Sequence, residues 1–212
     1  MDITVTGLDE RTGRAGMRAL HAAGAELGVL FTVTPEGRNR YPAGDWIREA
    51  VAAVPGRWAF HVCGRFARAK LLNGKFDFLA DVQRIQVNGL VADDELYQIC
   101  QKYPRHVIIT QNRSGNSVDI GCENHAVLVD GSGGRGITPA AWIRPSTPRS
   151  VGFAGGLGPH NLGQELQSIA KVACEPYWVD MEGRLRNSED WFSVAVAMRC
   201  VEIVQEAAKA GE

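Results

Sequence analysis

The sequence predicts a single, small (β/α)8 barrel, or TIM barrel, that spans residues 1–212. Eight short apolar runs alternate with helix-like or loop-like segments, and no linker divides the chain. Several of the runs lack polar alternation, which is typical of strands that are buried on both faces of a parallel sheet. A length of 212 residues is near the lower limit for this fold, so some connections must be short.

The eight expected strands are short and rich in Val, Ile, Phe or Trp. They cover residues 3–6, 27–33, 58–63, 84–88, 106–110, 126–130, 150–154 and 177–181. The fifth and sixth connections, which contain segments 112–125 and 138–148, have room for a short helix at most. An open doubly wound sheet is the alternative, but the G-x-G-x-x-G turn typical of that fold does not follow the first run. We therefore favour the barrel.

Helical patterns lie between the expected strands. Residues 13–24 end at a glycine, residues 42–54 open with a proline, and residues 92–102 begin with the acidic sequence ADDE. The pattern is clearest near the C-terminus, where Ser188 is expected to cap a helix with a long apolar stripe that begins at Trp191.

The composition argues against several functional classes. The chain is 45% hydrophobic and 22% charged, with a formal net charge of −1, so there is no electrostatic basis for binding nucleic acid. No apolar stretch approaches the ~20 residues of a membrane span, and the start of the chain does not read as a signal peptide. Five scattered cysteines predict neither a disulfide framework nor a zinc site and fit a reducing cytoplasm. No histidine pair has metal-ligand spacing, and His61 is interpreted as an ordinary strand residue.

Two adjacent glycines, Gly155 and Gly156, directly follow the expected seventh strand in the sequence VGFAGGLGPHN. In TIM barrels ligands bind at the C-terminal ends of the strands, and phosphate commonly binds to the loops after strands seven and eight. Backbone N–H groups of glycines can approach phosphate oxygens closely because no Cβ intervenes. Gly183 stands at the exit of the eighth strand. The spacing alone leaves open that these glycines only permit short turns.

Six segments resemble, in collinear order, the phosphoribosylanthranilate isomerase family. They are ITVTGLDERT, GVLFTVTPEGRNRYP, RIQVNG, VLVDGSGGRGITPAAW, FAGGLGPHNL and WVDMEGRLRN. The most specific match is FAGGLGPHNL, which is close to the family pattern S-G-G-L-x-P-x-N-V. The resemblance implies an Amadori rearrangement of an N-linked ribose phosphate in tryptophan biosynthesis.

The resemblance also implies roles for individual residues. Asp130 occupies the position of the family's general acid, and Thr6 occupies the position of its catalytic cysteine. Arg40 and Asp180 are expected to orient the substrate, and Asn88 stands where the family has a histidine. The expected phosphate-binding residues are Gly133, Gly134, Gly155, Gly156 and Gly183.

The main departure from the family pattern is Thr6. A hydroxyl is a far weaker acid than a thiol with a pKa of about 8.5, so Thr6 does not replace the cysteine as a base without activation. Cys63, at the end of the third expected strand, is the cysteine that we place on the catalytic face as a substitute. Glu182 adds a carboxylate near the expected phosphate, so it either points away or is compensated by Arg184 and Arg186.

Two functions therefore remain open. One is an isomerase like phosphoribosylanthranilate isomerase; the other is a diverged phosphosugar-binding barrel without this activity, either a regulatory protein or an enzyme for another phosphorylated substrate. Both predict a small phosphorylated ligand, no metal, no cofactor, no nucleic acid and no membrane. We expect a cytoplasmic monomer or homodimer.

Overall fold

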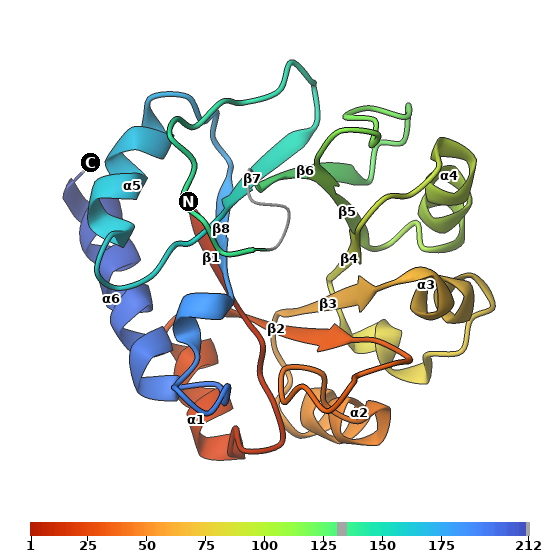
Figure 1. Cartoon of the computed structure of the whole chain (residues 1–212), viewed down its shortest axis with the longest axis horizontal. Coiled ribbons are helices and arrows are strands. Elements are labelled where there is room, and N and C mark those ends of the chain that lie inside the picture. Colours follow the sequence, from red (N-terminus) through yellow and green to blue (C-terminus); the bar gives the residue numbers. More distant parts are fainter. Residues whose placement is uncertain (131–134, 211–212) are drawn as a thin grey trace.

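The computed structural model describes residues 1–130 and 135–210 and shows a closed barrel of eight parallel strands. Each strand pairs with the next along the chain, and the last pairs with the first (Figure 1). The strands are β1 (Asp2–Thr6), β2 (Glu26–Phe31), β3 (Trp58–Cys63), β4 (Arg84–Asn88), β5 (Val107–Asn112), β6 (His125–Asp130), β7 (Ser150–Ala154) and β8 (Trp178–Met181). The predicted TIM barrel is confirmed, and the strand ends differ from the predicted ones by at most two residues.

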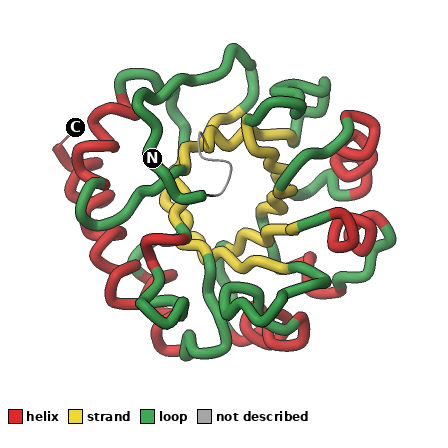
Figure 2. The backbone as a smooth tube through the Cα atoms, viewed as in Figure 1, coloured by secondary structure: helices red, strands yellow, loops and turns green. Residues whose placement is uncertain are grey.

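Helices surround the barrel on its outer side (Figure 2). The α-helices are α1 (Arg14–Ala22), α2 (Gly44–Ala53), α3 (Arg65–Leu72), α4 (Asp93–Lys102), α5 (Leu162–Ala170) and α6 (Val194–Ala210), and the 3-10 helices are η1 (Asp77–Asp81) and η2 (Gly183–Leu185). Among the described residues no helix follows β5 or β6, which agrees with the two short connections predicted from the sequence. None of the described helices has the length and hydrophobicity needed to span a bilayer.

Two apolar cores stabilise the barrel. The larger lies between the strands and the helices and contains fully buried residues such as Val5, Leu27 and Phe60. The smaller is a four-residue cluster inside the barrel. It consists of Ile109, Ala126, Leu128 and Trp178. Because alternate residues of a strand face opposite sides, the strands supply apolar side chains to the outer core and mainly polar ones to the interior.

A buried polar layer fills the barrel beside Trp178. The Nε atom of Arg84 lies 3.0 Å from Glu26 Oε1, and the Thr4 hydroxyl donates a 2.7 Å hydrogen bond to Glu26 Oε2. The Arg84 guanidinium lies 4.8 Å from the centre of the Trp178 ring. Since this layer is filled, space for a ligand remains at the C-terminal ends of the strands.

The predicted start of the last helix is wrong. Ser188 does not cap it, because α6 begins at Val194 and the preceding residues form a turn closed by a β-bridge between Arg186 and Phe192. Asp190 lies in this turn with a φ of 59°, and its carboxylate oxygen Oδ1 is 2.9 Å from the Nε atom of Arg186. The helix-like sequence pattern therefore begins several residues before the helix itself. The ion pair between Asp190 and Arg186 holds this preceding segment in the turn.

Candidate active site

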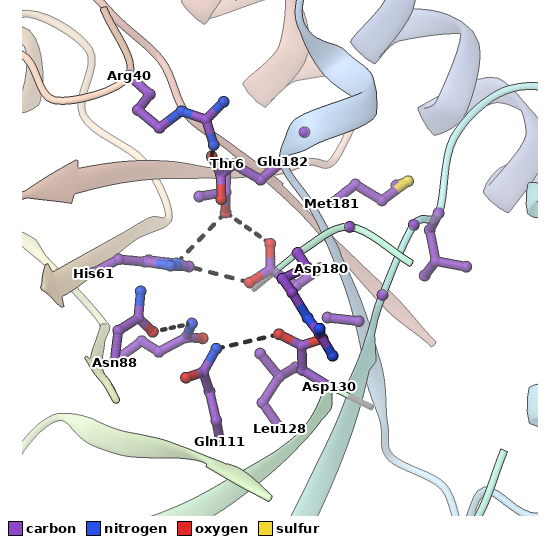
Figure 3. A pocket seen from close by; sticks show the side chains of 18 residues that line it. Thr6, Arg40, His61, Asn88, Gln111, Leu128, Asp130, Asp180, Met181 and Glu182 are labelled. Carbon is purple, nitrogen blue, oxygen red and sulfur yellow. Dashed lines mark hydrogen bonds and ion pairs between the residues drawn. The ribbon is translucent and has the colours of Figure 1, made fainter. Parts of the chain in front are cut away.

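A polar cavity of about 210 Å³ lies at the C-terminal mouth of the barrel (Figure 3). Six polar side chains that line it come from six different strands. They are Thr6, His61, Gln86, Gln111, Asp130 and Asp180. This is the end of the barrel at which the sequence predicted a ligand site, and it is the face where TIM-barrel enzymes carry their active sites.

Two buried carboxylates, Asp130 and Asp180, share one level of the barrel wall. In the strand register Ala154 of β7 pairs with Asp130 on one side and with Asp180 on the other. Since neighbouring strands are about 4.8 Å apart, the two Cα atoms are separated by about 10 Å along the wall. The small Ala154 side chain leaves space between them, and Gln111 Nε2 donates a 3.2 Å hydrogen bond to Asp130 Oδ2. The arrangement suits two proton-transfer groups on either side of one ligand.

Thr6 and His61 surround the Asp180 carboxylate. The Thr6 hydroxyl donates a 2.7 Å hydrogen bond to Asp180 Oδ1. His61 Nε2 lies 3.5 Å from Thr6 Oγ1 and 3.9 Å from Asp180 Oδ2. Strand β2 has a glycine beside Thr6, because a Cβ at Gly28 would overlap the Thr6 hydroxyl. Residues of β1, β2 and β3 therefore form the surroundings of the Asp180 carboxylate on β8.

Burial shifts the pKa values of this group strongly. It lowers the pKa of His61 to about 3, and the positive charge of Arg84 lowers it further, so His61 is neutral at physiological pH. Burial raises the pKa of Asp180 to about 7; the Thr6 hydrogen bond opposes this rise, whereas the nearby carboxylate of Glu182 adds to it. Asp180 therefore changes its protonation state near neutral pH, as is typical of acid–base groups in active sites.

The glycine loops after β7 and β8 line the same cavity. Gly156 has a φ of 57°, and a Cβ there would lie 2.6 Å from the Gly136 carbonyl oxygen. Asn161 fixes the loop after β7: its Nδ2 donates a 3.0 Å hydrogen bond to the Gly156 carbonyl, and its Oδ1 accepts one of 2.9 Å from the Gly158 N–H. Gly155 also has a positive φ, of 131°.

Gly183 differs from the two glycines after β7. A Cβ at Gly183 would meet no atom of the described residues within 4 Å, so none of their contacts requires a glycine there. The residue lies at the wall of the cavity. Predicted phosphate-binding residues Gly133 and Gly134 lie outside the described residues.

Arg40 lines the cavity but is held by two acidic side chains. Its NH1 atom lies 2.8 Å from Glu182 Oε1, and its NH2 atom lies 2.9 Å from Asp190 Oδ1. Burial raises the pKa of Glu182, whereas the positive charges of Arg40 and Arg186 oppose that rise. The carboxylate that departs from the family pattern is thus compensated chiefly by Arg40, a partner that the sequence did not predict.

Cys63 lines an adjoining cavity of about 460 Å³ and not the cavity that contains Asp130. Asn88 borders both cavities; its Nδ2 donates a hydrogen bond of 3.2 Å to the Cys63 sulfur, and its Oδ1 accepts one of 2.8 Å from Gln86. Burial raises the pKa of the Cys63 thiol to about 11, so very little thiolate exists at neutral pH.

Sequence reasoning missed three residues of the cavity wall: His61, Gln86 and Gln111. His61 interrupts a strand of apolar residues, whereas Gln86 and Gln111 lie in strands β4 and β5, which contain other polar residues as well. The two-residue periodicity of a strand places each of them on the inner face of the barrel. His61 pairs in register with Gln86, and Gln111 pairs with Leu128. A search for polar residues at inward positions of the expected strands would have found His61 and Gln86, whereas Gln111 lies one residue beyond the expected fifth strand.

The fold and the site define a (β/α)8 barrel with an acidic pocket at its C-terminal mouth. Its structure is similar to phosphoribosylanthranilate isomerase from Thermus thermophilus, with a TM-score of 0.69, 20% identity and coverage of 97% of this chain and 99% of that one. A phosphoribosylanthranilate isomerase in complex with reduced 1-(o-carboxyphenylamino)-1-deoxyribulose 5-phosphate aligns with a TM-score of 0.63, 14% identity and coverage of 97% and 99%. The structural resemblance predicted from the order of the sequence motifs is confirmed.

A barrel of another activity aligns with a lower TM-score. Orotidine 5'-monophosphate decarboxylase from Methanocaldococcus jannaschii aligns with a TM-score of 0.54, 11% identity and coverage of 95% of this chain and 97% of that one. No protein-family model and no curated protein matches the sequence. At these identities the comparisons define the fold, and the chemistry has to be argued from the cavity.

Proposed function

We propose that the chain catalyses an Amadori-type aldose–ketose isomerisation of an N-linked ribose phosphate, the reaction of phosphoribosylanthranilate isomerase. The observation that supports this most strongly is the pair of buried carboxylates, Asp130 and Asp180, on either side of Ala154 in a polar cavity. Asp130, oriented by Gln111, protonates the ribose ring oxygen. The ring C–O bond then breaks, and the lone pair of the substituent nitrogen forms the Schiff base.

The phosphate of the substrate binds to the loops that follow β7 and β8. Gly155, Gly156 and Gly183 line the cavity there, and backbone N–H groups without a neighbouring Cβ suit phosphate oxygens. Asn161 pre-organises the first of these loops, so little conformational entropy is lost when the ligand binds. Gly133 and Gly134 belong to the same proposed site.

The proposal places the reaction in tryptophan biosynthesis and the protein in the cytoplasm, which is compatible with its five free cysteines. The proposed function requires a small phosphorylated substrate. It is compatible with either a monomer or a homodimer.

Complementation tests the proposal in cells. Expression of the wild-type chain in a tryptophan auxotroph that lacks the isomerase is expected to restore growth, and Asp130→Asn is expected to abolish rescue. Asp81→Asn, which removes an exposed carboxylate at the end of η1, is the matched control and should rescue like the wild type. Failure of the wild type to rescue at high expression, together with no conversion of phosphoribosylanthranilate by purified protein, would reject the isomerase.

A second function is supported by different observations. Thr6 replaces the family's cysteine, and Arg40 is engaged by Glu182 and Asp190 rather than presented to a ligand. These features favour a phosphosugar-binding barrel without isomerase activity. A rise in melting temperature with ribose 5-phosphate but no turnover would support that function, since a ligand at 100 times its Kd adds about 2.7 kcal/mol of stability. If no ribose phosphate raises the melting temperature, both the isomerase and the phosphosugar-binding function are contradicted.

A further inference from the structure

The proposed isomerisation requires a base as well as the acid Asp130, because the sugar C2 must lose a proton after the Schiff base forms. Thr6 does not meet this requirement. Its hydroxyl donates a 2.7 Å hydrogen bond to Asp180 Oδ1, so the Thr6 proton is directed toward a carboxylate. A donor in that position orients an acid–base group instead of acting as one.

Three other side chains near the cavity are poor candidates. His61 is held neutral by burial and by Arg84, which lower its pKa to about 3 and make it a weak base. Cys63 borders the adjoining cavity, and its sulfur accepts a hydrogen bond from Asn88. Glu182 is engaged with Arg40 at 2.8 Å.

Asp180 has the geometry that these residues lack. It is 6% exposed, yet it lines the cavity, and its carboxylate points into the space between Thr6, His61 and Asp130 (Figure 3). Thr6 fixes Oδ1, whereas His61 Nε2 lies 3.9 Å from Oδ2, beyond hydrogen-bond distance. No described residue donates a hydrogen bond to Oδ2. One carboxylate oxygen is therefore anchored, and the other faces the ligand space.

We propose that the Asp180 carboxylate, positioned by the Thr6 hydroxyl, is the base that removes the proton from the sugar C2. This assignment rests on the proposed isomerisation. The C2–H electron pair forms the C1=C2 double bond, and the π electrons of the protonated Schiff base move to nitrogen, which gives the enolamine. Return of a proton to C1 and loss of the proton of the C2 hydroxyl give the ketose, so the reaction needs no further reactant.

The charges around Asp180 suit this role. Burial raises its pKa to about 7, which is close to the pH at which a general base is most effective. Thr6 of β1 lowers the pKa, and so does the more distant Arg84 of β4; Glu182 after β8 and Glu26 of β2 raise it, and His61 of β3 faces it without a charge.

Asp180→Asn tests the assignment. The amide has nearly the same shape and still accepts the Thr6 hydrogen bond, but it removes no proton. We expect turnover of phosphoribosylanthranilate to fall by at least ~100-fold, the lower end of what acid–base catalysis contributes. Reduced 1-(o-carboxyphenylamino)-1-deoxyribulose 5-phosphate should still raise the melting temperature of the variant, which shows that the site is intact. Asp81→Asn, far from the cavity, should keep wild-type turnover.

The pH profile of kcat tests the positioning role of Thr6. In the wild type kcat should rise with pH as Asp180 ionises. Thr6→Val removes the hydrogen bond that stabilises the carboxylate, so the midpoint of that rise should move to higher pH, and Thr6→Ser should restore it. A purely structural effect of Thr6→Val would lower kcat without moving the midpoint.

The outcomes separate this assignment from the proposed function. Turnover by the wild type that Asp180→Asn leaves within about threefold overturns the base assignment and leaves the isomerase intact. An unmoved midpoint in Thr6→Val overturns the positioning role. No turnover by the wild type overturns both the proposed function and the assignment.

Discussion

The Thr6 hydroxyl donates a 2.7 Å hydrogen bond to the Asp180 carboxylate, which joins the ends of the adjacent strands β1 and β8. This contact gives a role to Thr6, which stands where the phosphoribosylanthranilate isomerase pattern has a cysteine. Thr6 does not have to become a nucleophile or a base, because it orients a buried acid whose own pKa is raised to about 7. A threonine in place of the cysteine is therefore compatible with proton transfer by Asp180 at the adjacent ends of β1 and β8.

Thr6→Cys is expected to lower turnover several-fold. A thiol is a weak hydrogen-bond donor, and the neighbouring Asp180 carboxylate disfavours a thiolate, so the substitution loses the orienting contact without supplying an effective base. Steady-state kinetics of the variant against the wild type checks this. A rise in activity of ~100-fold or more would mean that the barrel holds the substrate but needs a cysteine at this position.

Asp180→Asn is expected to stabilise the protein more at high pH than at low pH. The folded-state pKa of about 7 lies above the ordinary value of 3.8, so ionisation opposes folding, and stability is lost as the pH rises through 7. The amide does not ionise, so the advantage of the variant should grow by about 2–3 kcal/mol between pH ~5 and pH ~8, since about two pKa units of the shift fall inside this range. Urea unfolding at both pH values measures it, and a difference independent of pH would contradict the raised pKa.

Arg40→Met is expected to destabilise the fold by about 1–3 kcal/mol, because the half-buried carboxylate of Glu182 loses its partner. The double variant Arg40→Met with Glu182→Gln should recover part of the loss. Arg38→Ala is the matched control: Arg38 is more exposed and lies 3.9 Å from Glu36, so its removal should change the free energy of unfolding by less than about 0.5 kcal/mol. If Arg40→Met and Arg38→Ala lower the free energy of unfolding equally, the Arg40 ion pair contributes no more to stability than an exposed one.

Gly183→Ala and Gly156→Ala are expected to act differently. A Cβ at Gly183 meets no atom within 4 Å in the part of the chain that the structure describes, so the variant should fold normally yet bind ribose 5-phosphate more weakly. At Gly156 a Cβ would lie 2.6 Å from the Gly136 carbonyl oxygen, and the φ of 57° is itself unfavourable, so this variant should lose stability as well. Melting temperatures with and without ribose 5-phosphate distinguish the two, and unchanged binding in Gly183→Ala would remove that residue from the phosphate site.

The barrel itself was predictable because eight short segments rich in Val, Ile, Phe or Trp recur along the chain, and their order along the chain is their order around the barrel. The glycines after β7 were predictable because the topology brings them to the ligand-binding end. The contacts of Thr6, His61 and Arg40 were not predictable, since each joins residues that are far apart in the sequence. Burial, which decides the protonation of Asp180 and His61, depends on the closed barrel and has no local sequence pattern.

The most direct test of the central claim is turnover of phosphoribosylanthranilate by the purified wild-type chain, followed by chromatography of the substrate and the ketose product. We expect conversion well above the uncatalysed rate, and loss of at least ~100-fold of that activity in Asp130→Asn. A wild-type rate no greater than the uncatalysed rate, in protein whose melting temperature rises with reduced 1-(o-carboxyphenylamino)-1-deoxyribulose 5-phosphate, would contradict the isomerase and leave a phosphosugar-binding barrel.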